Sequence, residues 1–249
     1  MSPRRPVSHP FVGSSAMDAL LARFDWARTP VGTPDKWPAT WRAATRLCLD
    51  SFVPMVVLLG KEHIMFYNDA CVPVVGGKHP RCLGRPAPTE WPEIWSGIVE
   101  PMVSHVLATG EPTGSDDLYL PVERNGYPEE THMLFAVSAI REDDGAPTAL
   151  LVTLRETTEK VLIARLVDCL DALSTRCFPA ETADEACRIA AEVTNGYLRD
   201  LPFALMYLVD ADGKHARLAA HSGLASAPED VAPSVVSLAA PEPGSTPWD

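Results

Sequence analysis

Residues 130–156 read ETHMLFAVSAIREDDGAPTALLVTLRE, and this stretch decides the fold. Its two ends, Glu130–Arg141 and Pro147–Glu156, are rich in the β-branched and apolar residues that favour strands. The intervening EDDGA (142–146) combines acidic residues with a glycine, as hairpin turns do. We therefore expect two paired antiparallel strands here.

Three further segments predict strands for the same sheet. FVPMVVLLG (Phe52–Gly60) is a short apolar run, and HIMFY (63–67) follows after only Lys61 and Glu62, which indicates a second hairpin. Ser115–Val122 is the third run. Five strands in about 110 residues make a complete small domain.

Short helices are predicted between the two hairpins. Asn68 and Asp69 can cap a first one. Glu93–Ala108 has apolar residues at helical spacing, Pro101 should kink or divide that helix, and Gly110 should end it. The order of elements predicts an α+β domain in which helices cover one face of an antiparallel sheet.

The chain divides into five expected segments. A basic, proline-rich lead (1–15) should be disordered, and a helical extension (16–50) follows it. The five-stranded domain spans 51–156, a helix spans 157–178, and a smaller α+β module spans 179–249. In that module we expect a helix from Ala183, a hairpin that turns at Asp212-Gly213, and a loop or frayed end from Gly223.

The helix at 157–178 carries apolar residues spaced alternately four and three apart, which is the seam of a two-stranded coiled coil. The seam residues are Ile163, Leu166, Leu170, Leu173 and Cys177. The spacing favours a homodimer. The alternative is a single amphipathic helix packed on its own domain.

Composition excludes several functions. The net charge of −12 provides no basic surface for nucleic acid or for an anionic membrane. The longest apolar run, Phe52–Leu59, is too short to span a bilayer, and no hydrophobic segment follows the basic N-terminus. We expect a cytoplasmic protein whose six cysteines are free thiols and bind no metal.

Catalytic motifs are absent from the sequence. It has no phosphate-binding GxxxxGK[ST] loop, no GxSxG elbow and no HExxH. Glu90 and Glu93 lie three residues apart beside tryptophans, where we interpret them as helix N-terminal charges and not as an acid–base pair. An enzyme that uses Cys71 or Cys82 is one alternative; buried, inert thiols are the preferred interpretation.

An ordered set of motifs between Asp25 and Lys160 resembles the N-terminal PAS domain of bacterial PAS/GAF sensor histidine kinases, many of them hybrids with receiver domains. The motifs are Trp37-Pro38, Tyr67-Asn68-Asp69-Ala70, Trp91-Pro92-Glu93-Ile94-Trp95 and Glu123-Arg124-Asn125-Gly126. The stretch Glu181–Leu224 is similar to the opening of a GAF domain. The resemblance implies a five-stranded PAS sheet with a helical cover, a small-molecule pocket and a dimeric signalling helix.

The sequence also departs from that family. No histidine has the context of a phosphoacceptor and there is no ATP-binding domain, so a kinase output domain would belong to a longer parent protein. The expected chain is a fragment or a truncated gene product with a partial GAF-like unit. The flavin-binding pattern is missing around Cys71 and Cys82. No histidine stands out as a haem ligand, and the sequence therefore does not identify a cofactor.

The predicted function is the sensory input of a two-component signalling protein, which senses a small ligand or a partner in the PAS domain and signals through a dimeric helix. A PAS module that only docks subunits is the alternative from another class. The pocket candidates are large side chains on the strands and the helical cover: Met55, Phe66, Tyr67, Trp95, Met102 and Phe135.

Overall fold

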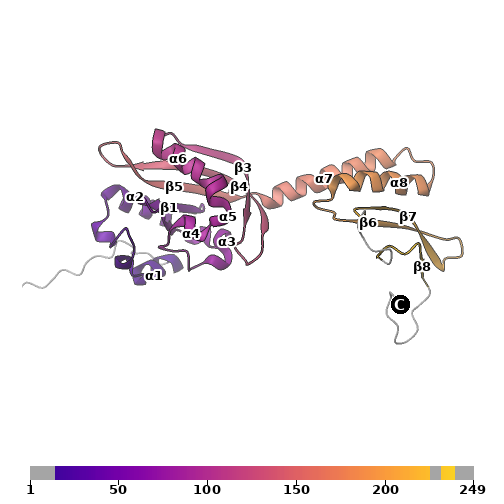
Figure 1. The fold of residues 1–249 in the computed structure, drawn as a ribbon, viewed down its shortest axis with the longest axis horizontal. Coiled ribbons are helices and arrows are strands. Elements are labelled where there is room, and N and C mark those ends of the chain that lie inside the picture. The colour runs from indigo at the N-terminus through magenta and orange to yellow at the C-terminus, as the bar shows by residue number, and fades with distance from the viewer. Residues whose placement is uncertain (1–14, 225–230, 239–249) are drawn as a thin grey trace, which may run out of the picture. The chain divides into compact units, whose positions relative to one another are not determined.

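The computed structural model describes residues 15–224 and 231–238. The chain forms two compact units, Met1–Glu159 and Lys160–Asp249 (Figure 1). The strands of the first unit are β1 (Met55–Leu59), β2 (Ile64–Tyr67), β3 (Thr113–Val122), β4 (Glu129–Arg141) and β5 (Pro147–Glu156). Its helices and helical turns are α1 (Ala16–Arg23), η1 (Trp26–Arg28), η2 (Pro34–Lys36), α2 (Ala39–Leu49), η3 (Asp69–Cys71), α3 (Val72–Val75), η4 (Gly76–Lys78), α4 (Ala87–Glu90), α5 (Pro92–Ile94), η5 (Trp95–Val99) and α6 (Glu100–Thr109).

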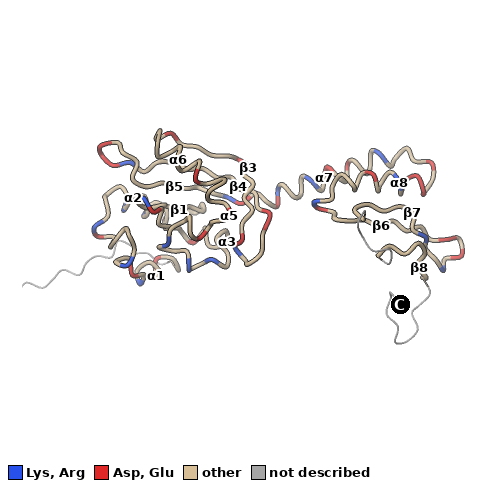
Figure 2. Tube along the Cα trace, in the orientation of Figure 1, with Lys and Arg blue, Asp and Glu red and all other residues tan. Residues whose placement is uncertain are grey.

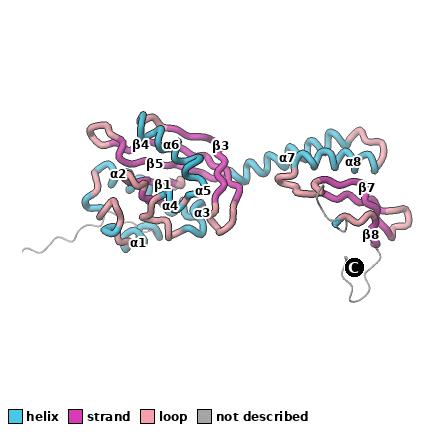
Figure 3. The backbone as a smooth tube through the Cα atoms, viewed as in Figure 1, coloured by secondary structure: helices cyan, strands magenta, loops and turns pink. Residues whose placement is uncertain are grey.

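The five strands form one antiparallel sheet in the order β2-β1-β5-β4-β3. Figure 3 shows the strands in magenta. The β4–β5 hairpin is the long one predicted from residues 130–156, and it pairs Phe135 with Leu154 and Val137 with Val152. The N-terminal strands β1 and β2 join the sheet on the other side of β5. The predicted α+β class with a five-stranded sheet is confirmed.

Both faces of the sheet are covered. Side chains alternate between the faces along a strand, so Val56 and Val57 point in opposite directions. Phe66 pairs with Val57 and lies on the same face, where its ring is 6.0 Å from that of Trp26 and 6.4 Å from that of Trp37. The predicted N-terminal helical extension therefore covers one face, while α3 to α6 cover the other.

Asn68 joins the N-terminal extension to the sheet. Its side-chain amide donates hydrogen bonds to the carbonyls of Cys48, Ser51 and Val53, and its Oδ1 accepts from the backbone N–H groups of Met55 and Cys71. The bond from Cys71 is the predicted cap of the short helical turn. Only 1% of Asn68 is exposed, so each of these bonds replaces one to water.

The helix predicted over 93–108 has an irregular turn next to Pro101. Its helical backbone runs through α5, the π-helical turn η5 and α6 without a gap, and the proline is the second residue of α6, directly after the π-turn. A proline has no N–H to donate to the preceding turn, so a departure from regular α-helical bonding is expected at this point. Gly110 ends α6 in the left-handed conformation, with φ of +72°, as predicted.

The second unit contains most of α7 (Thr158–Cys177), followed by α8 (Ala183–Thr194), η6 (Asn195–Tyr197), β6 (Ala204–Val209), β7 (His215–Ser222) and β8 (Val235–Ser237). The β6–β7 hairpin turns at Asp212-Gly213 as predicted. The prediction of a loop or frayed end from Gly223 was wrong at Val235–Ser237, which pairs with β7. Three residues are too few for a strand pattern to be visible. The lead at 1–14 and the segments 225–230 and 239–249 lie outside the described residues.

Lysine and arginine are scattered among acidic residues along the described chain (Figure 2). Within the same residues, no helix combines the length and the apolar character needed to cross a bilayer.

Candidate functional site

A cavity of about 90 Å³ lies between the sheet and its helical cover in the first unit. The residues that line it from the strands are Val56, Leu58, Met65, Leu120, Val122, Met133, Phe135, Val152 and Leu154. Those that line it from the helices and turns are Cys71, Val74, Val75, Ala87, Trp91, Ile94, Trp95 and Val99. All are apolar or sulfur-bearing, so the cavity presents almost no hydrogen-bonding groups.

Two of the predicted pocket residues, Trp95 and Phe135, line this cavity. Phe66 is buried on the opposite face of the sheet, against the tryptophans of the N-terminal extension. The Tyr67 hydroxyl lies 3.0 Å from Nδ1 of His79 and accepts a hydrogen bond from the Cys82 thiol at 3.4 Å.

Met55 and Met102 are partly buried and pack at the border of the core. Most of the cavity wall is made by smaller residues that the size-based prediction did not select, such as Val56 and Val152. Strand alternation could have found them, because Val56 and Leu58 lie two residues apart on one face.

A buried lysine fixes the part of the helical cover formed by α4 and α5. Lys78 Nζ donates to the backbone carbonyl of Glu90 at 2.6 Å and to Oε1 of Glu93 at 2.7 Å, and it lies 3.9 Å from the centre of the Trp91 ring. The same Glu93 oxygen accepts the backbone N–H of Glu123 at 3.0 Å. Burial would raise the pKa of Glu93, but these hydrogen bonds outweigh it and the pKa is lowered.

Glu90 is also neutralised by cations. Its carboxylate is 3.2 Å from Nε of Arg81 and 2.7 Å from Nε of Arg85. The interpretation of Glu93 as a helix N-terminal charge agrees with its place in the first turn of α5. Glu90 is instead the last residue of α4, and the cations that contact the two carboxylates come from η4 and from the turn between η4 and α4.

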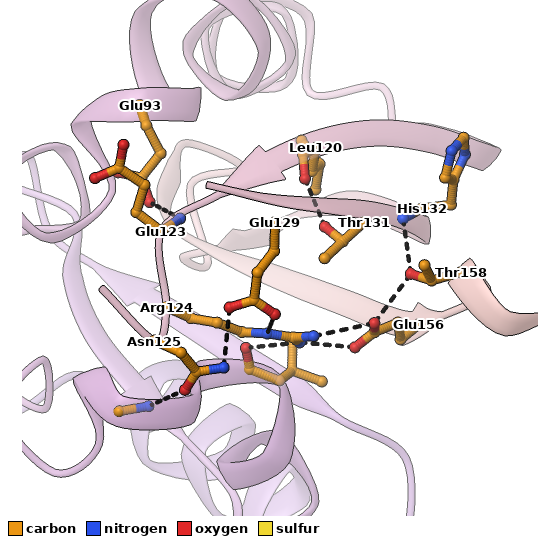
Figure 4. Close-up of polar contacts among 12 residues, drawn as sticks. Glu93, Leu120, Glu123, Arg124, Asn125, Glu129, Thr131, His132, Glu156 and Thr158 are labelled. Atoms are coloured by element: carbon orange, nitrogen blue, oxygen red, sulfur yellow. Dashed lines mark hydrogen bonds and ion pairs between the residues drawn. The ribbon is translucent and has the colours of Figure 1, made fainter. Parts of the chain in front are cut away.

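Arg124, in the predicted Glu123–Gly126 motif, forms a bridge near the end of the sheet (Figure 4). Its Nε donates to Glu129 at 3.0 Å, and its two terminal nitrogens donate to the two carboxylate oxygens of Glu156 at 2.7 and 3.1 Å. It also donates to the backbone carbonyl of Val74, a cavity-lining residue, at 3.4 Å. One guanidinium therefore contacts the cavity wall and the last residue of β5.

Glu156 connects this bridge to the first residue of α7. Its Oε1 accepts a hydrogen bond from Oγ1 of Thr158 at 2.9 Å, and that hydroxyl accepts the backbone N–H of His132 at 3.0 Å (Figure 4). The N–H of Thr157 donates to the His132 carbonyl at 2.7 Å. The hydrogen bond from Arg124 is the main reason that the pKa of Glu156 is lowered, so the bridge is charged at neutral pH.

The cysteine thiols of the first unit are poor nucleophiles. Cys71 lines the cavity and Cys82 lies against Tyr67. Burial raises the pKa of both thiols, and it raises that of Cys48 to about 12. In the described ranges, no three His, Cys, Asp or Glu side chains are grouped as a metal site.

The helix α7 presents an apolar stripe in the single chain. The seam residues Ile163, Leu166 and Leu170 are 53%, 52% and 55% exposed. The last two seam residues differ, because Leu173 is half-buried and the Cys177 thiol contacts the Ala186 carbonyl of α8. We call Ile163, Leu166 and Leu170, with the exposed Leu162 and Val167, the α7 stripe.

The five-stranded sheet and its helical cover have a PAS fold, and the sequence of residues 49–162 matches the family described as PAS fold. No curated protein matches the chain. Among solved structures, the PAS domain of BvgS from Bordetella pertussis is 19% identical, with a TM-score of 0.40, and the match covers 54% of this chain and 98% of that one.

Two other structures of similar proteins are a sensory box sensor histidine kinase from Vibrio cholerae and an RNA-binding light-oxygen-voltage receptor. The first is 14% identical with a TM-score of 0.34, covering 47% of this chain and 93% of that chain. The second is 18% identical with a TM-score of 0.39, covering 59% of this chain. The match spans only 42% of the receptor's length.

Proposed function

We propose that this chain is the sensory input region of a cytoplasmic two-component signalling protein, in which occupancy of the PAS cavity changes how α7 is held. The observation that carries the proposal is the position of Arg124. It contacts Val74, which lines the cavity, and Glu156, which binds Thr158 at the start of α7.

The paired hydrogen bonds between Arg124 and Glu156 suit a switch, because they form together or are lost together. An arginine fork binds both oxygens of one carboxylate only when the two planes are aligned. A molecule that displaces Val74 by a fraction of an ångström would disturb the alignment with Glu156. A ligand shifts this equilibrium only if it binds the two arrangements with different affinity.

The output in this proposal is the pairing of the α7 stripe with that of a second copy. Three adjacent large apolar residues that are each more than half exposed favour such pairing. The GAF-like second unit and a kinase output domain would then lie downstream in the parent protein. The same stripe also supports the alternative of a ligand-free docking module, which would dimerise whatever the cavity contains.

A double-mutant cycle with hydrogen exchange tests the coupling. Val152→Phe places a ring in the cavity and imitates occupancy. We expect it to increase amide exchange over residues 157–165 in the otherwise native chain. In an Arg124→Gln background the amides should already exchange faster, and Val152→Phe should add nothing further.

Arg155→Gln is the matched control, since Arg155 is exposed and adjacent to Glu156 on the same strand. It should leave the response to Val152→Phe intact. Equal responses in the native and Arg124→Gln backgrounds would contradict the coupling. A chain that remains a dimer with unchanged α7 exchange in every variant would favour the docking module.

A further inference from the structure

The cavity itself restricts what can occupy it. An engineered cavity of about 150 Å³ lined by Leu, Ile and Phe stays dry and binds benzene or xenon. The present one is smaller, about 90 Å³, and its wall is equally apolar. A charged or strongly polar molecule would lose its hydration there and find no partner. The fitting class is a small, uncharged, apolar molecule.

Two parts of the wall are fixed by polar contacts. Val74 is held through its carbonyl by Arg124, and the N–H of nearby Gly77 donates to Asn125 at 3.3 Å. Trp91 and the adjoining α5 are held by Lys78. The strands that line the cavity are fixed by the backbone hydrogen bonds between neighbouring strands.

The part formed by Trp95–Val99 is attached differently. It is a π-helical turn, and in the described part of the chain no side-chain hydrogen bond or ion pair ties these residues to their surroundings. The ring contact made by Trp95 is with His63, at 5.3 Å between ring centres and 39° between planes. Gly97 lies within the turn, is exposed and has open space around the position of a Cβ atom. Single π-turns of this kind often occur at functional sites.

His63 is held in place by the hairpin that carries it. It has φ of +54°, unusual for a residue other than glycine, and its carbonyl accepts the N–H of Ala87 at 3.0 Å. The hairpin thus places the imidazole against Trp95, whose indole lines the cavity.

We propose that the cavity takes up a small, uncharged, apolar molecule through the Trp95–Val99 turn, with the His63–Trp95 ring contact as the latch. The inference deepens the proposed function, because it names the ligand class and the route of entry to the same cavity. The latch is a gate on the rate of binding, so it changes how fast a ligand exchanges and leaves the affinity nearly unchanged.

Binding is tested on the full chain with xenon and with two rings of similar shape, cyclopentane and pyrrolidinium, which differ in charge. Methyl resonances of Val56 and Val152 report directly on the cavity. Xenon and cyclopentane should produce saturable shifts, and pyrrolidinium should produce none. Val152→Phe should abolish the shifts. Absence of saturable shifts, or equal shifts with pyrrolidinium, overturns the ligand class.

The route is tested by exchange kinetics of cyclopentane in three variants. His63→Asn removes the ring but keeps a residue that tolerates positive φ, and it should speed exchange about fivefold to tenfold, the effect of losing one aromatic contact from a barrier. Gly97→Ala stiffens the turn and should slow exchange. His105→Asn, at an exposed position on α6, should change nothing.

Unchanged rates in both His63→Asn and Gly97→Ala overturn the route. The readouts also separate this inference from the proposed function. Cyclopentane that binds at the cavity methyls without altering amide exchange in α7 would defeat the coupling and retain the ligand class. If the cavity bound none of the probes but α7 still responded to Val152→Phe, the ligand class would be overturned and the coupling would be retained.

Discussion

Filling the cavity should stabilise the first unit, and adjacent residues of β1 provide both the test and its control. Val56 points into the cavity, whereas Val57 is fully buried on the opposite face. Val56→Leu and Val57→Leu therefore make the same chemical change on the two sides of one strand.

The magnitudes follow from the void. At about 24 cal/mol per Å³, an empty volume of about 90 Å³ destabilises the fold by about 2 kcal/mol. One added methylene recovers about 0.8 kcal/mol of this. Val56→Leu should therefore raise the free energy of unfolding by about 0.5–1 kcal/mol. Val57→Leu should lower it by about 1–3 kcal/mol, the cost of overpacking a filled site.

Urea denaturation followed by tryptophan fluorescence measures both variants, because every tryptophan except Trp248 lies in the first unit. The slope of the transition should stay constant while the midpoints move in opposite directions. A Val56→Leu chain destabilised as much as Val57→Leu would mean that the cavity has no free volume, and it would remove the basis for a ligand there.

Three further perturbations separate the other features. Leu166→Glu with Leu170→Glu should give a monomer in sedimentation experiments, because like charges would face each other across the seam; an unchanged dimer would rule out pairing through the α7 stripe. The pKa of Glu156 is lowered from 4.5 chiefly by the hydrogen bond from its arginine partner, so its stabilising contribution is complete above pH 4.5 and is lost as pH falls through the lowered value. Glu156→Gln should make the acid side of the stability profile shallower, and an identical profile would count against the bridge. Asn68→Ala should cost about 2–4 kcal/mol in the same urea assay, since it leaves several buried backbone groups unpaired.

Periodicity in the sequence was sufficient to predict the strands of the sheet and most of the helices. The β4–β5 hairpin could be predicted because its alternating apolar runs and its turn are local signals. The three residues of β8 could not, since no repeat is visible over that length. The predicted segment boundaries and the pairing of α7 stay predictions.

The candidate site was harder to predict, because it depends on register and on incomplete packing. Arg124 and Glu156 are separated by 32 residues and meet only once β4 has been placed between β3 and β5. A void exists where neighbouring side chains fail to fill a space, and no single residue type marks it. Choosing large aromatics selected Phe66 and Tyr67, whose side chains complete other contacts.

The N-terminal extension that covers the Phe66 face of the sheet has a practical consequence for anyone who isolates this domain. The family match begins at residue 49, but the rings of Trp26 and Trp37 lie against Phe66 from outside that range. A recombinant fragment cut at the start of the match would present bare aromatic and aliphatic surface to water and would tend to precipitate. The smallest piece that keeps its own surface polar begins ahead of α1, whose Met17 donates its backbone N–H to Asp69.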